Sequence, residues 1–192
     1  GGDPLYFNVQ RPGRSNTTLG QGYAFGRRAD TTDRAFMSGG VGILIDDDGS
    51  DRYEGSIFAQ GGGFWFSTGI LADRAGDDTY DSLWYGIAAG AHYSLGFLLE
   101  GGGNDVYGGV LPRVNVTIAG GHDYTAVFLI DEAGNDMYLG SRITIGSGNA
   151  NGMGFLVDNA GTDQYDTRSL YGIGSAGLLA DDAPGGARRK LI

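Results

Sequence analysis

The sequence predicts an all-β fold: a parallel β-helix or β-roll solenoid of about six to seven coils, each of about 27 residues. Three observations support this prediction. A segment of 11 residues recurs along the chain, 38 of the 192 residues are glycine, and the apolar residues occur in short strand-like runs without a helical period. Together they indicate short strands and glycine-rich turns stacked along one axis.

The recurring segment is the strongest of these observations. Five copies align without gaps: ILIDDDGSDRY (43–53), ILADRAGDDTY (70–80), FLLEGGGNDVY (97–107), FLIDEAGNDMY (128–138) and FLVDNAGTDQY (155–165). A sixth, LLADDAPG (178–185), begins in the same way. The closing tyrosines are spaced by 27, 27, 31 and 27 residues, and four extra residues near 108–115 account for the 31. Such a period is typical of solenoid proteins.

Each repeat supplies the same local elements. Three apolar residues form a run that suits a strand and is too short for a helix, and Asp-x-x-Gly follows as a turn. The residues after the tyrosine read as a second strand. A unit of this size cannot bury its own apolar face, so we expect successive copies to stack in parallel, with the central leucines forming one ladder.

Composition narrows the partners and the domain organisation. The net charge of −10 argues against nucleic acid, no apolar run is long enough for a membrane span, and the absence of cysteine excludes disulfides. We predict one solenoid domain over residues 1–182, with a degenerate first coil and insertions in 1–40, and a C-terminal tail over 183–192. Because the chain ends in a half repeat, we expect self-association or an adjacent solenoid domain.

Two acidic residues recur in every turn and are the candidate metal ligands. Stacking brings these like charges together, at a cost of roughly a few kcal/mol per close pair at an effective dielectric constant near 20. Two interpretations remain open: Ca²⁺ binds between the turns, or each Asp accepts hydrogen bonds from turn amides and points to solvent. The candidate ligands are Asp46, Asp51, Asp73, Asp78, Glu100, Asp105, Asp131, Asp136, Asp158 and Asp163.

These turns resemble a known family. GGGNDVYGG (101–109), AGNDMYLG (133–140) and AGDDTY (75–80) are similar to the Gly-Gly-x-Gly-x-Asp-x-hydrophobic nonapeptides of RTX, or haemolysin-type, calcium-binding β-rolls. The resemblance covers about eight residues of each coil and implies a secreted or cell-surface protein whose turn aspartates bind calcium. The implied ligands are Asp51, Asp78, Asp105, Asp136 and Asp163. The motif occurs here once per coil, whereas RTX motifs run in tandem.

A second candidate site lies where polar residues interrupt the repeat. Counted back from the first acid of each coil, His92 and Asp123 share one position, and His122 and Asn149 share the position before it. We predict that the two imidazoles lie within roughly 8 Å of each other. One interpretation is a His92, His122 and Asp123 site for metal binding or acid/base catalysis, bordered by Asn149 and Asn151. The other is that glycine-rich turns tolerate any polar residue.

Both faces of the leucine-centred strands are apolar, although a solenoid wall has one face inside and one outside. We therefore expect the outer face to be covered by residues 7–40, with Phe25 and Phe36 packing there, by another domain, or by another molecule. The sequence favours a non-catalytic structural or binding solenoid of the cell surface or extracellular space, stabilised by calcium and self-associating, with glycans as candidate ligands of its aromatic residues. The alternative is a β-helix enzyme that acts on glycans or esters at the histidine site.

Overall fold

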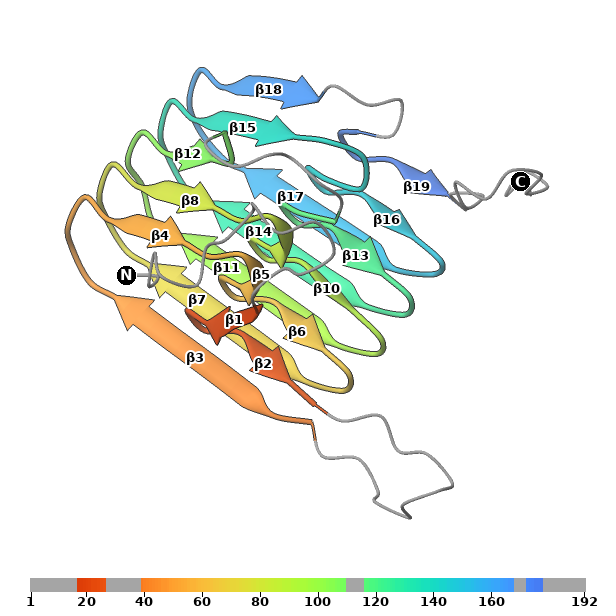
Figure 1. The fold of residues 1–192 in the computed structure, drawn as a ribbon. Helices are drawn as coiled ribbons and strands as arrows, with labels where there is room; N and C mark the ends of the chain where they lie inside the picture. The colour runs from red at the N-terminus through yellow and green to blue at the C-terminus, as the bar shows by residue number, and fades with distance from the viewer. Residues whose placement is uncertain (1–16, 27–38, 110–115, 168–171, 178–192) are drawn as a thin grey trace, which may run out of the picture.

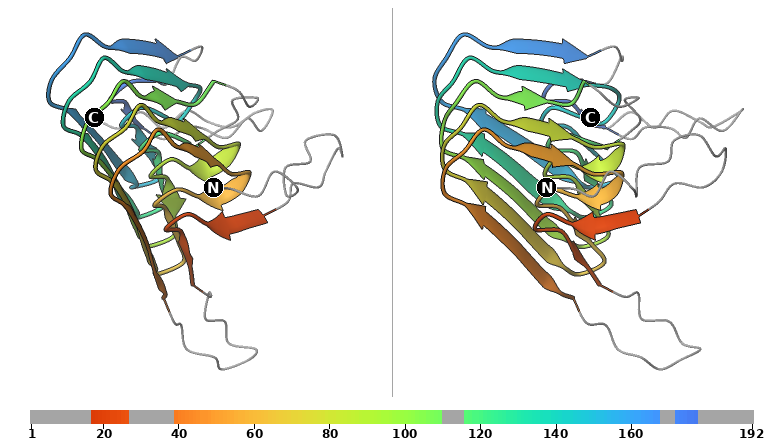
Figure 2. Two further views of the ribbon diagram at one scale, coloured as in Figure 1. Left: turned by 90° about the vertical axis from the view of Figure 1, so that its left-hand side faces the viewer. Right: turned by 60° about the vertical axis from the view of Figure 1, so that its left-hand side comes forward.

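The computed structural model describes residues 17–26, 39–109, 116–167 and 172–177, and this part of the chain is all-β (Figure 1). All strand pairs are parallel, and the strands of each sheet lie one above another in every view (Figure 2). The predicted fold class, a parallel β-solenoid, is confirmed.

Four sheets, which we name A to D, form the walls of the solenoid. Sheet A contains β1 (Thr17–Gly20), β5 (Ile57–Ala59) and β9 (Trp84–Gly86). Sheet B contains β2 (Ala24–Phe25), β6 (Gly63–Phe64), β10 (Gly90–Ala91), β13 (Gly121–His122), β16 (Gly148–Asn149) and β19 (Ala176–Gly177). Sheet C contains β3 (Val41–Asp46), β7 (Thr68–Asp73), β11 (Leu95–Glu100), β14 (Ala126–Asp131) and β17 (Met153–Asp158). Sheet D contains β4 (Arg52–Glu54), β8 (Thr79–Asp81), β12 (Val106–Tyr107), β15 (Met137–Gly140) and β18 (Gln164–Thr167).

The described residues form fewer coils than the six to seven expected. Sheets C and D have five strands each, so the chain completes about four turns between β3 and β17. Residues 17–26 join the stack, because β1 pairs with β5 and β2 pairs with β6. The sixth repeat and the tail over 183–192 lie outside the described residues, as do 1–16 and 27–38 of the expected first coil.

Sheet C fixes the orientation of the repeat. Its five strands pair residue for residue, so Ile70 lies beside Phe97 and Phe97 beside Phe128. Side chains alternate between the two faces of a strand, and burial follows that alternation. The second, fourth and sixth residues of each strand point inward, and the first, third and fifth point outward. The leucine column therefore faces the core.

The long repeat does not disturb this register. Leu95 pairs with Ala126, 31 residues later, and Val106 pairs with Met137 in sheet D. The four extra residues are therefore accommodated between β12 and Val116, where the chain passes from sheet D toward sheet A.

Two ladders fill the core. Leu71, Leu98 and Leu129 are fully buried on sheet C. On sheet D, the tyrosines stack face to face with ring centroids 4.7–5.0 Å apart, and the three central rings are fully buried. Identical side chains repeat at the strand spacing, so each coil presents the packing surface that the next coil needs. The stacked tyrosines are Tyr53, Tyr80, Tyr107, Tyr138 and Tyr165.

The corners between sheets use left-handed backbone. His92 (φ 62°) and Tyr93 (φ 58°) form one such pair between sheets B and C, and Asp123 (φ 50°) and Tyr124 (φ 56°) form the equivalent pair in the next coil. In the acidic turns glycine is required instead. Gly76 has φ 154°, and a Cβ there would lie 1.5 Å from the Gly49 carbonyl oxygen of the preceding coil.

Candidate functional site

The first acid of each repeat points into the solenoid rather than to solvent. It is the sixth residue of its sheet C strand and so shares a face with the leucine column. Asp73, Glu100 and Asp131 are each at most 2% exposed. The interpretation in which the acidic side chains point to solvent is therefore wrong for the central coils, because strand alternation turns this position inward.

The second acid is buried too in the three central repeats, and the second acids form a ladder with backbone amides. The Asp51 amide donates to Asp78 Oδ1 at 2.6 Å, and the Asp78 amide donates to Asp105 Oδ1 at 2.6 Å. The amides of Asp105 and Asp136 continue the ladder toward the next coils at 2.8 and 3.0 Å. Four of these carboxylates thus bind the main chain of the preceding coil through one oxygen, as the turn-amide interpretation expected: Asp78, Asp105, Asp136 and Asp163.

The tyrosine ladder supplies further donors to the acids. Tyr53 Oη donates to Asp73 Oδ2 at 2.5 Å, and Tyr107 Oη donates to Asp131 Oδ2 at 2.7 Å, in each case to the following coil. Tyr80 donates to Glu100 in the same way. We name the ten inward acids together with these phenols the acidic column. At the outer side of the turns, Asn104 and Asn135 form a separate, exposed ladder of amide hydrogen bonds.

Four carboxylate oxygens of the acidic column are buried without a hydrogen-bond donor. They are Asp78 Oδ2, Asp105 Oδ2, Asp131 Oδ1 and Asp136 Oδ2. A buried acceptor without a partner costs about 1–3 kcal/mol, and more when it is charged. Such atoms are satisfied by a proton or a cation at the same place.

The carboxylates gather in groups of three that bridge successive coils. In each group, one oxygen from every member lies within 4.8 Å of the others. The four residues that have a buried oxygen without a hydrogen-bond donor are all members of these groups. The groups are Asp46, Asp51 and Asp73; Asp73, Asp78 and Glu100; Asp105, Asp131 and Asp136; and Asp136, Asp158 and Asp163.

Burial raises the pKa of these carboxyls in the absence of a cation. Loss of solvation is the largest cause, and neighbouring acids add to it. The pKa rises to about 8 for Glu100 and Asp105 and to about 6 for Asp78 and Asp136, and it is also raised for Asp131. Without a cation, the centre of the acidic column therefore holds protons near neutral pH.

The donor set decides which cation suits the column. It consists of carboxylate oxygens, and the described groups contain neither imidazole nor thiolate. Hard oxygen ligands favour Ca²⁺ or Mg²⁺ over Zn²⁺ or Cu²⁺. Mg²⁺ usually keeps several water molecules, whereas Ca²⁺ accepts a shell of protein oxygens. The buried position of the acids thus favours Ca²⁺.

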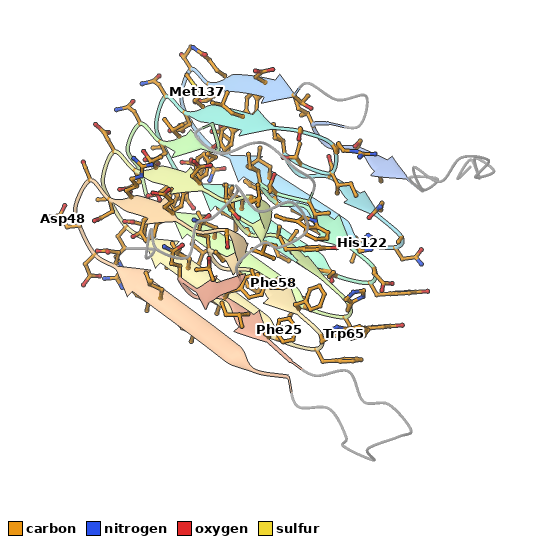
Figure 3. The ribbon with its side chains drawn as sticks, in the orientation of Figure 1. Phe25, Asp48, Phe58, Trp65, His122 and Met137 are labelled. Atoms are coloured by element: carbon orange, nitrogen blue, oxygen red, sulfur yellow. The ribbon has the colours of Figure 1, made fainter. Side chains whose placement is uncertain are left out.

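The histidine site forms at the opposite edge of the solenoid from the acidic turns, as the positions of His122, Trp65 and Asp48 show (Figure 3). His92 Nδ1 lies 2.5 Å from Asp123 Oδ2, and His122 Nδ1 lies 2.5 Å from Asn149 Oδ1. Because both oxygens are acceptors, Nδ1 carries the proton in each neutral ring and Nε2 carries the lone pair. The imidazole centroids are 6.1 Å apart, within the predicted distance.

Aromatic side chains flank this polar corner. Trp65 stacks on His92 with centroids 4.0 Å apart. Phe66, Tyr93 and Tyr124 form a neighbouring ladder with centroids 5.2 and 4.9 Å apart and nearly parallel rings. A sugar ring binds to an aromatic ring whose face is open. In this ladder the ring faces stack on one another, so the faces between neighbouring rings are not open to a sugar.

Two observations limit the chemistry of the corner. Ser94 is 4% exposed, and its Oγ lies 2.8 Å from the Gly63 carbonyl oxygen and 2.9 Å from the Ala91 carbonyl oxygen, either of which accepts its single proton. Ser94 is therefore held as a structural group. His92, His122 and Asp123 do not form a three-ligand group of the kind found in the acidic column, within the residues described. In the coil after that of His122, Asn149 is buried against His122, while Asn151 is exposed at the corner of the same coil.

Comparison with known proteins does not assign the chain to a family. No family model, no curated protein and no solved structure matches the chain. The similarity to RTX turns thus remains a prediction from the motif. In the part of the chain described, no helix is long and apolar enough to cross a membrane.

Sequence reasoning missed the tyrosines as partners of the acids. The signal was present, because the tyrosine always follows the second acid by two residues and so lies on the same side of an extended chain. The Trp65–His92 stack was missed as well. Its signal was the shared position of the two residues, each eight before the first acid of its coil.

Proposed function

We propose that this chain is a non-catalytic structural or binding β-solenoid of the extracellular space or cell surface, which self-associates and is stabilised by Ca²⁺ held in the acidic column. The observation that carries the proposal is the set of carboxylates that gather in groups of three between coils, four of which have a buried oxygen without a hydrogen-bond donor. The similarity of the turns to RTX motifs supports the choice of calcium and of the compartment.

The proposed role of the cation follows from charge. At neutral pH the buried acids of adjacent coils either hold protons or repel one another, as their raised pKa values indicate. A divalent cation between coils replaces the protons and attracts carboxylates from both sides. It thereby links each coil to the next, as a solenoid requires, since its stability depends on the interfaces between repeats.

The test is calcium-dependent stability. We expect the purified protein to contain Ca²⁺ by elemental analysis, and chelation at about pH 7.5 to lower the melting temperature by several degrees. Added Ca²⁺ should restore the melting temperature, because a ligand that binds only the folded state stabilises it. An unchanged melting curve in chelator, with no metal in the purified protein, would contradict the proposal.

A matched pair of variants localises the effect. Asp105→Asn keeps the acceptor for the Asp78 amide and converts the donorless oxygen into an amide nitrogen that can donate to a neighbouring carboxylate. It should raise the melting temperature of the metal-free protein and weaken its response to Ca²⁺. Asp48→Asn, at an exposed position of an acidic turn, should change neither. Equal responses of the two variants would place the cation elsewhere.

A second candidate function is acid/base catalysis on a glycan or an ester at the polar corner. The observation that favours it is the His92–Asp123 pair, because a carboxylate on Nδ1 orients an imidazole whose Nε2 can accept a proton. The test is hydrolysis of a chromogenic ester by the wild type and by His92→Gln. Equal rates for the two proteins, at the level of buffer alone, would exclude this function for esters.

A further inference from the structure

The outer face of sheet C is a regular apolar surface. We define the sheet C face as the first, third and fifth residues of β3, β7, β11, β14 and β17. None of these side chains is charged, and Thr68 is the only polar one. Val41 is 70% exposed, Ile43 59% and Met153 52%, so the face is open to solvent.

The expected internal cover is not on this face in the described residues. Phe25, which the sequence suggested as part of the cover, packs instead on Phe64 and Phe58 beside sheet B. That assignment was wrong, because β2 pairs with β6 and so carries Phe25 to the other wall. Phe36 lies outside the described residues.

The shape of the face suits another flat, periodic surface. Its strands are in unbroken one-to-one register, and Figure 2 shows sheet C as a flat wall. Phe97, Phe128 and Phe155 stack along its middle with centroids 5.2 and 4.7 Å apart. The sheet C face of a second copy has the same strand spacing and is equally free of charge. It is therefore a matching partner for this face.

The size of the face is sufficient for a dimer. Five strands at ~4.8 Å spacing and six residues at ~3.3 Å rise give a flat footprint of roughly 480 Å² per copy. Two such footprints total roughly 960 Å². Protruding side chains raise the accessible area above the flat footprint, which brings the total toward the lower end of the range of about 1,200–2,000 Å² found in stable interfaces.

Charge selects the orientation of the two copies. Every sheet C strand ends at an acidic turn, and the net charge of the chain is −10. A two-fold axis parallel to the solenoid axis makes the strands antiparallel across the interface and places the acidic turns of the two copies at opposite edges. A two-fold axis parallel to the strands would instead bring both sets of acidic turns together at one edge, where they repel.

We propose that two copies of this chain pair through their sheet C faces, with antiparallel strands across the interface and sheets about 10 Å apart. The inference deepens the self-association proposed above and names its surface. It does not depend on the cation, because the acidic column lies on the inner side of the same sheet.

The first experiment measures the association state. Sedimentation equilibrium of the wild type should give a dimer. Phe128→Lys, at the centre of the face, should weaken association by at least about tenfold, because it buries an unpaired charge. Val106→Lys, on the outer side of sheet D, is the matched control and should leave the dimer intact. If Phe128→Lys does not fold, Leu99→Lys, at a position that is 37% exposed, tests the same surface.

The second experiment tests the orientation. The chain has no cysteine, so Ile70→Cys and Phe128→Cys each provide a unique thiol. With the axis parallel to the solenoid, each variant should cross-link to itself with a short bismaleimide. Cross-linking only between the two different variants would overturn the antiparallel arrangement.

The remaining outcomes are also decisive. A monomeric wild type overturns the proposal. In that case, rapid labelling of the Phe128→Cys thiol would show that the sheet C face is open to solvent. Slow labelling would show that another part of the same chain covers the face. Calcium content and melting temperature, measured on the same samples, separate this result from the fate of the calcium proposal. A dimer that dissociates with Phe128→Lys but retains bound calcium supports the interface alone.

Discussion

Single residues in this protein carry conformations that side chains ordinarily avoid. The corner pairs adopt left-handed backbone with tryptophan, histidine, tyrosine and alanine at the strained positions. A non-glycine residue in that region costs about 1–2 kcal/mol. The strain recurs at the same place in successive coils, so the hydrogen bonds between coils hold it in place, as between the Tyr93 amide and the Asp123 carbonyl.

A glycine substitution tests the strain. Ala150 has φ 48° at one such corner, so Ala150→Gly should increase the free energy of unfolding by about 1 kcal/mol despite the greater flexibility of the unfolded chain. Ala133, in an exposed acidic turn, is not among the positive-φ residues, and Ala133→Gly should decrease stability by about 0.5–1 kcal/mol. Urea unfolding measures both changes, and a loss of stability for both variants would show that the corner is not strained.

The phenols of the acidic column provide a second test at the residue scale. Tyr80→Phe removes the donor to Glu100 Oε2 in the fully buried part of the column and should destabilise the protein by about 1–3 kcal/mol. Tyr165→Phe removes a phenol–carboxylate bond to Asp158 of the same repeat, where the ring is 40% exposed and water can replace the phenol. Comparable losses from the two substitutions, measured by urea unfolding, would argue against burial as the cause.

At the scale of elements, the strand and the turn that follows it set the position of every acid. The repeat predicted the sheet C strands, their parallel stacking and the leucine ladder, because a three-residue apolar run is too short for a helix and a unit of this size must stack to bury its apolar face. It did not predict that the acids point inward. Acidic side chains usually point to solvent, and this suggested an outward direction. Asp73, however, is two residues after Leu71 on the same strand, so its side chain lies on the same inward face.

The same reasoning explains the histidine corner. Counting positions from the first acid placed His92 and Asp123 in one column, and the structure joins them by a hydrogen bond. The stacking of Trp65 on His92 could not be derived in the same way. It depends on rotamers at a left-handed corner, which the sequence pattern does not specify.

The acidic column predicts an unusual pH dependence. In the metal-free protein the folded pKa values of Glu100 and Asp105 are about 8, above the unfolded values of about 4. The folded state therefore binds more protons between those values, and stability falls as pH rises through this range. In chelator, the melting temperature should drop by at least about 3 °C between pH ~5.5 and ~8.5. Excess Ca²⁺ should reduce the drop, and a rise with pH in chelator would show that the column is not protonated.

At the scale of the whole molecule, cohesion depends on contacts between neighbouring coils. The inward residues of β7, β11 and β14 are buried, whereas those of β3 and β17 are only half-buried. In such a stack, each coil is stabilised by the coils on its two sides. The described ends of sheet C therefore have the weakest cohesion.

Hydrogen exchange should reveal this gradient. Amides of β11 should exchange slowest, those of β7 and β14 at intermediate rates, and those of β3 and β17 fastest, because local opening begins where burial is least. Mass spectrometry of peptic fragments resolves these strands. Uniform protection across the five strands would show that the molecule opens only as a unit.

The 31-residue repeat shows where this architecture accepts extra sequence. The chain lengthens between β12 and Val116, yet sheets C and D resume their pairing without a shift. Extra residues in this connection therefore leave the register of sheets C and D unchanged. An epitope, an affinity tag or a linker to a second protein grafted here would be displayed at a fixed height on the rod, and the equivalent corners of other coils would place further cargo at multiples of about 4.8 Å.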